Sequence, residues 1–360
     1  MKKLLLSLAA TAALAIAASQ PASAQMDKVK ACFIYVGPIG DFGWSYQHHQ
    51  GLLQVEEELG DKVETAYLES VPEGADAERA IERFARSGCN IIFTTSFGYM
   101  DATNKVAAKF PDVKFEHATG YKRESPNVST YNSKFHEGRY IQGQIAAKMS
   151  TAGVAGYIAS FPIPEVVMGI NSFMLGAQSV NPDFKLKIVW INSWMDPAKE
   201  GEAAKALFDQ GVDIITQHTD STEPLKIAQE RGKLGFGQAH DMYDAAPKAQ
   251  LTAIVDNWGP YYIARTKAAM DGTWKSQASW DGLAEGTVKM SDYTNMPDDV
   301  AAAAKDMQAK ITSGEFHPFT GPIYKQDGTE VAADGVVMDD VSLLTMDYYV
   351  KGVDGTPGTN

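Results

Sequence analysis

The chain has 360 residues, a formal net charge of −13 and 44% hydrophobic residues. The negative charge argues against binding to nucleic acid or to an anionic membrane, because phosphate contacts need clustered Lys and Arg. One hydrophobic core rarely supports a chain of this length, so we predict two lobes.

The first 24 residues have the pattern of a secretory signal peptide. Lys2 and Lys3 precede an apolar stretch, and Ala22-Ser23-Ala24 supplies a small-residue cleavage site. We expect an exported, soluble mature chain that starts near Gln25, the alternative being a retained membrane anchor. No lipobox Cys stands directly after the apolar stretch, so the protein is expected to diffuse freely in the periplasm of a two-membrane bacterium.

Strand and helix patterns alternate along the next part of the chain. Four β-rich runs are separated by three stretches with helical spacing of apolar residues. This order predicts a parallel sheet covered by helices on both faces. The strands are expected at 28–36, 63–68, 90–95 and 113–117, and the helices at 47–59, 75–87 and 101–110.

A second α/β series begins after Tyr131. Its helices are expected at 137–149, 166–180, 198–210 and 223–231, and its strands at 153–160, 187–191, 213–217 and 234–237. A strand at 251–255 and a helix at 261–270 are expected to return to the first lobe, and the turn-rich tail to hold one helix at 297–312. The expected lobes are 27–132 with 252–285, and 133–251 with 286–352.

The two cysteines, Cys32 and Cys89, each lie in an apolar, strand-like run. An exported protein allows them to form a disulfide, but they could also be neighbouring core thiols. Free thiols are the favoured interpretation, because Cys packs well as a small hydrophobe. Neither the cysteines nor the seven histidines have metal-ligand spacing, so we expect no metal and no cofactor.

Aromatic and acidic residues gather in the segments that follow the predicted strands. In an open α/β sheet these segments face the ligand crevice. Trp44 and Trp194 belong to different lobes, and two indoles meeting across a closing cleft would sandwich a flat heteroaromatic ring. Acidic side chains on the rim would accept hydrogen bonds from ring N–H and amino groups. The other candidate ligand contacts near the cleft are Asp41, Phe42, Phe97, Gly98, Glu165, Asp220 and Trp258.

No catalytic constellation is recognisable in the sequence. A nucleophile elbow, a Walker A loop, a dinucleotide-binding glycine motif and a zinc-protease motif are all absent. The carboxylate pairs Asp298-Asp299 and Asp339-Asp340 are interpreted as solvated surface. The sequence therefore favours binding over catalysis.

Four segments carry a resemblance to a known family, namely 36–44, 135–146, 193–197 and 211–214. They resemble the basic membrane protein family, substrate-binding proteins of ABC importers that include the purine nucleoside receptors. The resemblance extends over residues 28–352 and implies a type I periplasmic-binding fold, with two doubly wound lobes joined by three hinge crossings. It also implies a monomer that encloses a small molecule between its lobes and delivers it to an ABC permease and its ATPase.

The family's site residues can be placed on this chain one by one. Its paired stacking aromatics fall on Trp44 and Trp194, and the acidic residue of its first loop falls on Asp41. Its aromatic loop after the third strand falls on Phe97 and Gly98. The resemblance therefore implies the same stacked, planar ligand as the residue pattern.

Two departures from the family pattern concern the sugar end of the site. The turn after the eighth strand keeps one of two acids, Asp241, and the Ser and Lys near the ribose are replaced by Ala253 and Asp256. A site with fewer partners for ribose hydroxyls has less reason to prefer a nucleoside. The hypothesis is a free purine base, adenine first, with Asp241 or Asp256 near its amino edge. A nucleoside, riboflavin or a sugar is the alternative ligand, and a purine-processing enzyme is the alternative class.

Overall fold

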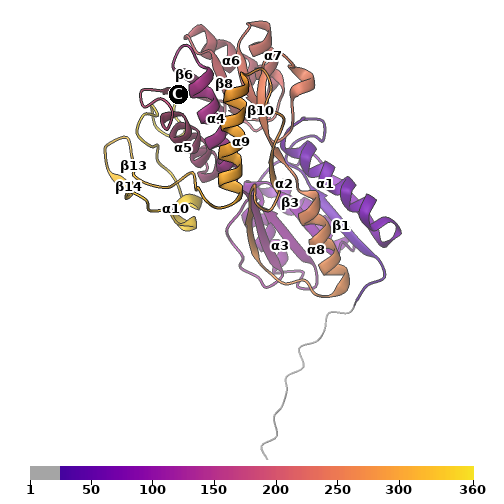
Figure 1. Cartoon of the computed structure of the whole chain (residues 1–360). Coiled ribbons are helices and arrows are strands. Elements are labelled where there is room, and N and C mark those ends of the chain that lie inside the picture. Colours follow the sequence, from indigo (N-terminus) through magenta and orange to yellow (C-terminus); the bar gives the residue numbers. More distant parts are fainter. Residues whose placement is uncertain (1–24) are drawn as a thin grey trace, which may run out of the picture.

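The computed structural model describes residues 25–360, which form two α/β lobes (Figure 1). The sheet of the first lobe has the strand order β11-β5-β4-β3-β1-β2, and that of the second lobe β12-β10-β9-β8-β6-β7. All neighbouring strands in these sheets are parallel except β10 and β12. The predicted two-lobed, doubly wound architecture is confirmed. The expected signal peptide lies outside the described residues, and no helix within 25–360 is long and apolar enough to cross a membrane.

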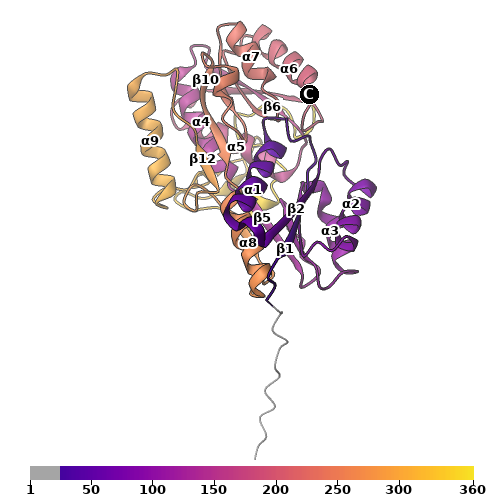
Figure 2. The ribbon, with the colours of Figure 1, turned by 90° about the vertical axis from the view of Figure 1, so that its right-hand side faces the viewer.

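The first lobe contains most of the chain up to residue 133 and a later return. Its strands are β1 (Val29–Ile34), β2 (Val63–Leu68), β3 (Ile91–Thr95), β4 (Lys114–Ala118), β5 (Val128–Ser133) and β11 (Ala278–Asp281). Its helices are α1 (Trp44–Leu59), α2 (Ala75–Arg86), α3 (Met100–Ala107) and α8 (Gly259–Asp271). Figure 2 shows α8, from the C-terminal half of the chain, beside α1.

The second lobe contains the central part of the chain and its C-terminal tail. Its sheet strands are β6 (Val154–Ala159), β7 (Lys185–Trp190), β8 (Ile214–His218), β9 (Leu234–Gly237), β10 (Gln250–Asp256) and β12 (Val288–Met290). Its helices are α4 (Phe135–Met149), α5 (Pro164–Gln178), α6 (Pro197–Asp209), α7 (Glu223–Glu230) and α9 (Asp298–Thr312). The tail adds the hairpin β13 (Ile323–Tyr324) and β14 (Glu330–Ala332) and the short helix α10 (Asp340–Leu344).

Helices cover both faces of the first lobe's sheet. Successive side chains of a strand point to opposite faces, so both sets are buried. On β1, Ala31 and Phe33 belong to the cluster under α1 and α8, whereas Cys32 and Ile34 belong to the cluster under α2 and α3. This two-sided burial explains why β1 is a continuous apolar run rather than an alternating one.

The chain crosses between the lobes three times, after β5, after β10 and after β11. The second of these crossings corrects the expected boundary at residue 252. Because β10 pairs with β9 and β12, residues 252–256 belong to the second sheet rather than the first. An apolar strand pattern shows that a strand is buried, but not which of two parallel sheets it joins.

Cys32 and Cys89 form a disulfide, which corrects the expectation of free thiols. Cys32 lies on β1, Cys89 lies in the turn before β3, and their Cα atoms are 6.0 Å apart. Both side chains are buried beside Phe84 and Ile92 in the cluster under α2 and α3. The two cysteines are thus buried in the core, as expected, but they are bonded to each other rather than free.

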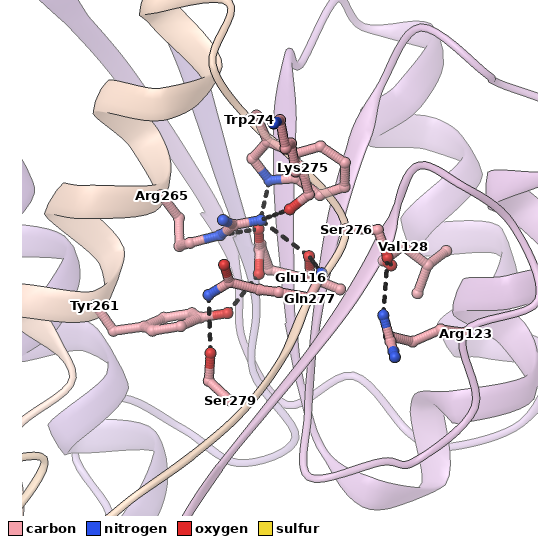
Figure 3. Close-up of polar contacts among 11 residues, drawn as sticks. Glu116, Arg123, Val128, Tyr261, Arg265, Trp274, Lys275, Ser276, Gln277 and Ser279 are labelled. Carbon is pink, nitrogen blue, oxygen red and sulfur yellow. Dashed lines mark hydrogen bonds and ion pairs between the residues drawn. The ribbon is translucent and has the colours of Figure 1, made fainter.

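A buried ion pair fixes the segment that leads from α8 to β11 (Figure 3). Glu116 on β4 is fully buried and accepts hydrogen bonds from Arg265 Nε at 2.6 Å and Trp274 Nε1 at 2.6 Å. The other Glu116 oxygen accepts from the Tyr261 hydroxyl at 2.7 Å. Arg265 also donates to the Lys275 carbonyl at 2.8 Å. These hydrogen bonds attach the segment before the third crossing to β4, near the centre of the first sheet.

Replacement of Arg265 by Met should lower the free energy of unfolding by about 3–5 kcal/mol, because it leaves Glu116 as an unpaired buried charge. Urea unfolding measures this change. Lys267→Met on the same helix removes an exposed pair with Glu58 and should have little effect. Equal losses in the two variants would contradict the structural role of the Glu116 network.

Reduction of the disulfide should also destabilise the protein. The bridge closes a loop of 57 residues, and chain-entropy arguments assign about 4 kcal/mol to a loop of that size. We expect dithiothreitol to lower the unfolding midpoint of the wild type and to leave the Cys32→Ala/Cys89→Ala variant unchanged. Alkylation of the denatured, unreduced wild type would contradict the bridge if it labelled two thiols.

Candidate functional site

A cavity lined by residues of both lobes lies between them. Its lining residues come from both sheets and lie at or after the carboxyl ends of strands, as expected for ligand sites in open α/β sheets. The first lobe contributes Val36, Trp44, Ser96, Phe97 and Thr119, and the second lobe contributes Ile163, Glu165, Trp194, His218, Asp220 and Gln238.

Trp44 forms a rigid wall of this cavity. Its indole Nε1 donates to the Thr95 carbonyl at 2.7 Å, and its ring packs edge-on against His48 and Trp258 with centroids 4.3 and 5.5 Å away. Because the N–H is already bonded within the protein, Trp44 offers the cavity an aromatic surface and no free donor.

Trp194 reaches the cavity from the second lobe. Its ring centroid lies 5.1 Å from that of Phe161, and its Nε1 is buried without a hydrogen-bond partner among residues 25–360. The structure thus brings the two predicted tryptophans to one cavity. A planar guest between them would meet aromatic carbon from both lobes.

Asp220 connects the lobes at the edge of the cavity. Its Oδ1 accepts the backbone N–H of Trp44, the first residue of α1, at 3.0 Å. The first N–H groups of a helix lack partners inside the helix and attract negative charge. Asp41 of the same lobe accepts the next two N–H groups of α1, those of Ser45 and Tyr46, and Asp220 from the opposite lobe adds the acceptor for the first.

Gly43 is required for this close approach. A Cβ atom at this position would lie 2.6 Å from Asp220 Cβ and 2.8 Å from Asp220 Cα. Such distances are well inside van der Waals contact. The lobes can therefore reach this arrangement only if residue 43 has no side chain.

Burial governs the ionisation of the acidic groups around the cavity. It raises the pKa of Asp220 well above the usual range, and the nearby Asp41 carboxylate raises it further. Burial likewise raises the pKa of Asp256, with the Glu165 charge as the next cause. A carboxyl group with a raised pKa holds its proton more readily, and it can then donate as well as accept a hydrogen bond.

Glu165 and His218 form a second polar element on the cavity wall. His218 Nε2 lies 3.6 Å from Glu165 Oε1, and both side chains are largely buried. Burial lowers the pKa of His218, which favours the neutral imidazole. Within residues 25–360, no group of three or more His, Cys, Asp or Glu side chains has the arrangement of a metal site.

Five predicted site residues line the cavity, and six do not. The five are Trp44, Phe97, Glu165, Trp194 and Asp220. Three of the others have another environment. Asp41 accepts the N–H groups of Gly43, Ser45 and Tyr46. Gly98 donates to Glu73, and Trp258 is buried against Trp44.

Phe42, Asp241 and Asp256 also differ from expectation. Phe42 is 52% exposed and lines an outer groove together with Asp241. The Asp241 carboxylate accepts from Gln250 Nε2 at 2.6 Å. Asp256 is buried at the end of β10 and has no hydrogen-bond partner among the described residues, but it does not line the cavity. A position in a cleft loop does not determine the direction of its side chain.

Six lining residues were not among the predicted contacts, and two of them, His218 and Gln238, carry polar side chains in the second lobe. His218 is the last residue of β8, and Gln238 directly follows β9. The rule that strand ends face the crevice could have found both. Neither residue was predicted, because one carries a neutral amide and the other an imidazole, and the predicted contacts were all aromatic or acidic residues or glycine.

Residues 28–318 match the family model described as ABC transporter substrate-binding protein PnrA-like. A purine-binding protein of Brucella abortus is 65% identical over 328 residues, which cover 91% of this chain and 93% of that protein. A Haloferax volcanii protein named as a glucose-binding protein of an ABC transporter is 34% identical, with 91% and 81% covered. Among solved structures, a solute-binding protein of an Aeropyrum pernix ABC transporter superposes with a TM-score of 0.68 at 19% identity, covering 88% of this chain and 95% of its own.

Gly43→Ala should hold the lobes apart, because the added methyl group meets Asp220 in the closed arrangement. We expect a larger radius of gyration by small-angle X-ray scattering in the variant than in the wild type. Gly40→Ala is the matched control, since a Cβ there meets nothing within 4 Å. An identical scattering curve for Gly43→Ala and wild type would contradict the required close approach.

Proposed function

This chain belongs to the PnrA-like family of ABC transporter substrate-binding proteins, and we propose that it captures a free purine base, adenine first, in the cavity between its lobes. The observation that carries the proposal is the position of Trp44 and Trp194, one from each lobe, on the walls of a single cavity. Stacking of one base on an aromatic side chain contributes about 1–3 kcal/mol.

The polar lining of the cavity also supports a small heterocycle. Glu165 and Asp220 supply carboxyl groups for ring N–H and amino groups, and Gln238 supplies an amide. The 65% identical relative is named as a purine-binding protein, which supports the same ligand class.

Capture of the ligand in this proposal depends on closure of the lobes. The three crossings act as a hinge, and the ligand is buried when Asp220 reaches the N-terminus of α1. The closed protein then delivers the base to an ABC permease and its ATPase. We propose that it does so in the periplasm, on the basis of the charged and apolar N-terminal pattern of the sequence, and as a monomer, in line with the family resemblance.

A purine nucleoside is a second candidate ligand. An adjoining groove shares Val36, Trp194 and Asp220 with the cavity and adds polar residues. Ser70 and Glu73 line it from the first lobe, and Asn192 and Ser193 from the second. Such a groove could hold a sugar attached to the base. The relative named as glucose-binding makes a free sugar the third candidate.

A binding panel tests these candidates. Calorimetry and thermal unfolding with adenine, hypoxanthine, guanine, adenosine and glucose should show the tightest binding and the largest melting shift for adenine. A ligand at a hundredfold excess over its Kd adds about 2.7 kcal/mol to stability. Binding of nucleosides alone would contradict the free-base proposal, and binding of glucose alone would contradict the purine class.

Trp194→Ala should weaken binding of the base by about 5- to 150-fold, the equivalent of one lost stacking contact. Phe42→Ala is the control, because Phe42 is an exposed aromatic of the cleft region that does not line the cavity. Circular dichroism should show both variants folded. Equal affinities of Trp194→Ala and wild type would remove the stacking contact from the proposal.

A further inference from the structure

Arg139 on α4 is fully buried beneath the cavity and holds four acceptors at once. Its Nη1 donates to Gln142 Oε1 at 3.0 Å and to Thr216 Oγ1 at 2.7 Å. Its Nη2 donates to the Gln217 carbonyl at 2.7 Å and to Gln238 Oε1. The guanidinium also lies 5.2 Å from the centre of the Tyr157 ring. No carboxylate among residues 25–360 forms an ion pair with it, so its contacts serve to hold neutral groups in place.

The contact with Arg139 determines which way the Gln238 amide points. A guanidinium only donates hydrogen bonds, so the amide atom that faces it must be the oxygen. The amide nitrogen, Nε2, is then turned away from Arg139 and has no hydrogen-bond partner among residues 25–360. Gln238 is 2% exposed and lines the cavity. The direction of the Gln238 Nε2 donor is therefore set by Arg139, which its own hydrogen bonds hold in place.

We infer that Arg139 fixes Gln238 as a hydrogen-bond donor to an unprotonated ring nitrogen of the bound base. Arg139 is a positioning residue in this inference, and Gln238 is the residue that determines specificity. The inference rests on the proposed function, because it assigns one contact to a purine in that cavity. The first-lobe wall cannot take this role through Trp44, whose indole N–H is bonded to Thr95.

The contact has a chemical consequence for ligand choice. Replacement of the matching ring nitrogen by C–H leaves the Gln238 donor buried without an acceptor. Affinity for such an analogue should fall by about 10- to 100-fold. The three carbon-for-nitrogen analogues, 1-deazaadenine, 3-deazaadenine and 7-deazaadenine, each remove one acceptor and keep the flat ring. One of them should bind much more weakly than the other two.

Gln238→Glu tests the donor while keeping the acceptor for Arg139. Calorimetry should show adenine binding weakened by about 10- to 100-fold. The deaza-analogue that wild type rejects should bind this variant at least as well as adenine does, because the donor that favoured adenine is gone. The carboxylate oxygen repels the lone pair of the facing ring nitrogen but not a C–H, so a reversal of the wild-type preference for adenine over this analogue identifies the contact. Gln142→Glu places the same charge on another partner of Arg139, and we expect it to retain the wild-type ratio of adenine to deaza-analogue affinity.

Arg139→Lys tests the positioning role. A Lys ammonium cannot hold four acceptors in the planar geometry of a guanidinium, so the Gln238 amide becomes free to rotate. The ratio of affinities for adenine and the sensitive analogue should shrink, whereas a purely structural role would weaken all ligands by one factor.

Two results would contradict the inference. In the first, the affinity of each deaza-analogue relative to adenine is the same in wild type and in Gln238→Glu. In the second, Gln238→Glu binds adenine as tightly as wild type does. Wild type that binds no purine would instead refute the proposed function. The two failures are therefore distinguishable in one set of titrations.

Discussion

The constraint on which the site depends is the parallel arrangement of two sheets whose strands end toward the same cleft. Parallel strands place their following loops at one edge, so each lobe presents a row of loops to the other. The cavity exists only where these two rows meet, because its lining residues come from both lobes. The disulfide and the buried Glu116 network stabilise the first lobe, and so keep one row of loops in a fixed position.

The contact between the lobes depends both on the Asp220 carboxyl group and on the space left by Gly43. Asp220 is buried where it meets α1, and burial raises its pKa. The N–H of Trp44 offsets part of that cost, because a helix N-terminus favours an acceptor. The absence of a side chain at Gly43 is what brings the two groups within hydrogen-bond distance. Arg139, in contrast, donates its hydrogen bonds to neutral acceptors. The carboxyl groups of the cavity therefore remain available to a ligand.

The sequence predicts the architecture well because apolar periodicity reports burial directly. It predicts β1 and α5 but not β5, whose polar side chains are nevertheless buried throughout. It also assigns β10 to the wrong lobe, because pairing partners depend on contacts distant in sequence. At the site, post-strand loops identify Trp44 and Trp194. They do not reveal that Asp41 accepts the N–H groups of Gly43 and of two residues in the first turn of α1, or that Arg139 contacts Gln238.

The hydrogen bond from the Trp44 indole to Thr95 has a consequence for how such a receptor can diversify. With that nitrogen occupied, the main aromatic surface of the first lobe accepts any flat ring without distinguishing its edge atoms. The charged and imidazole groups of the cavity, Glu165, His218 and Asp220, all come from the second lobe. Substitutions confined to the second lobe could therefore retune ligand preference, while the platform on the first lobe and the hinge stay unchanged.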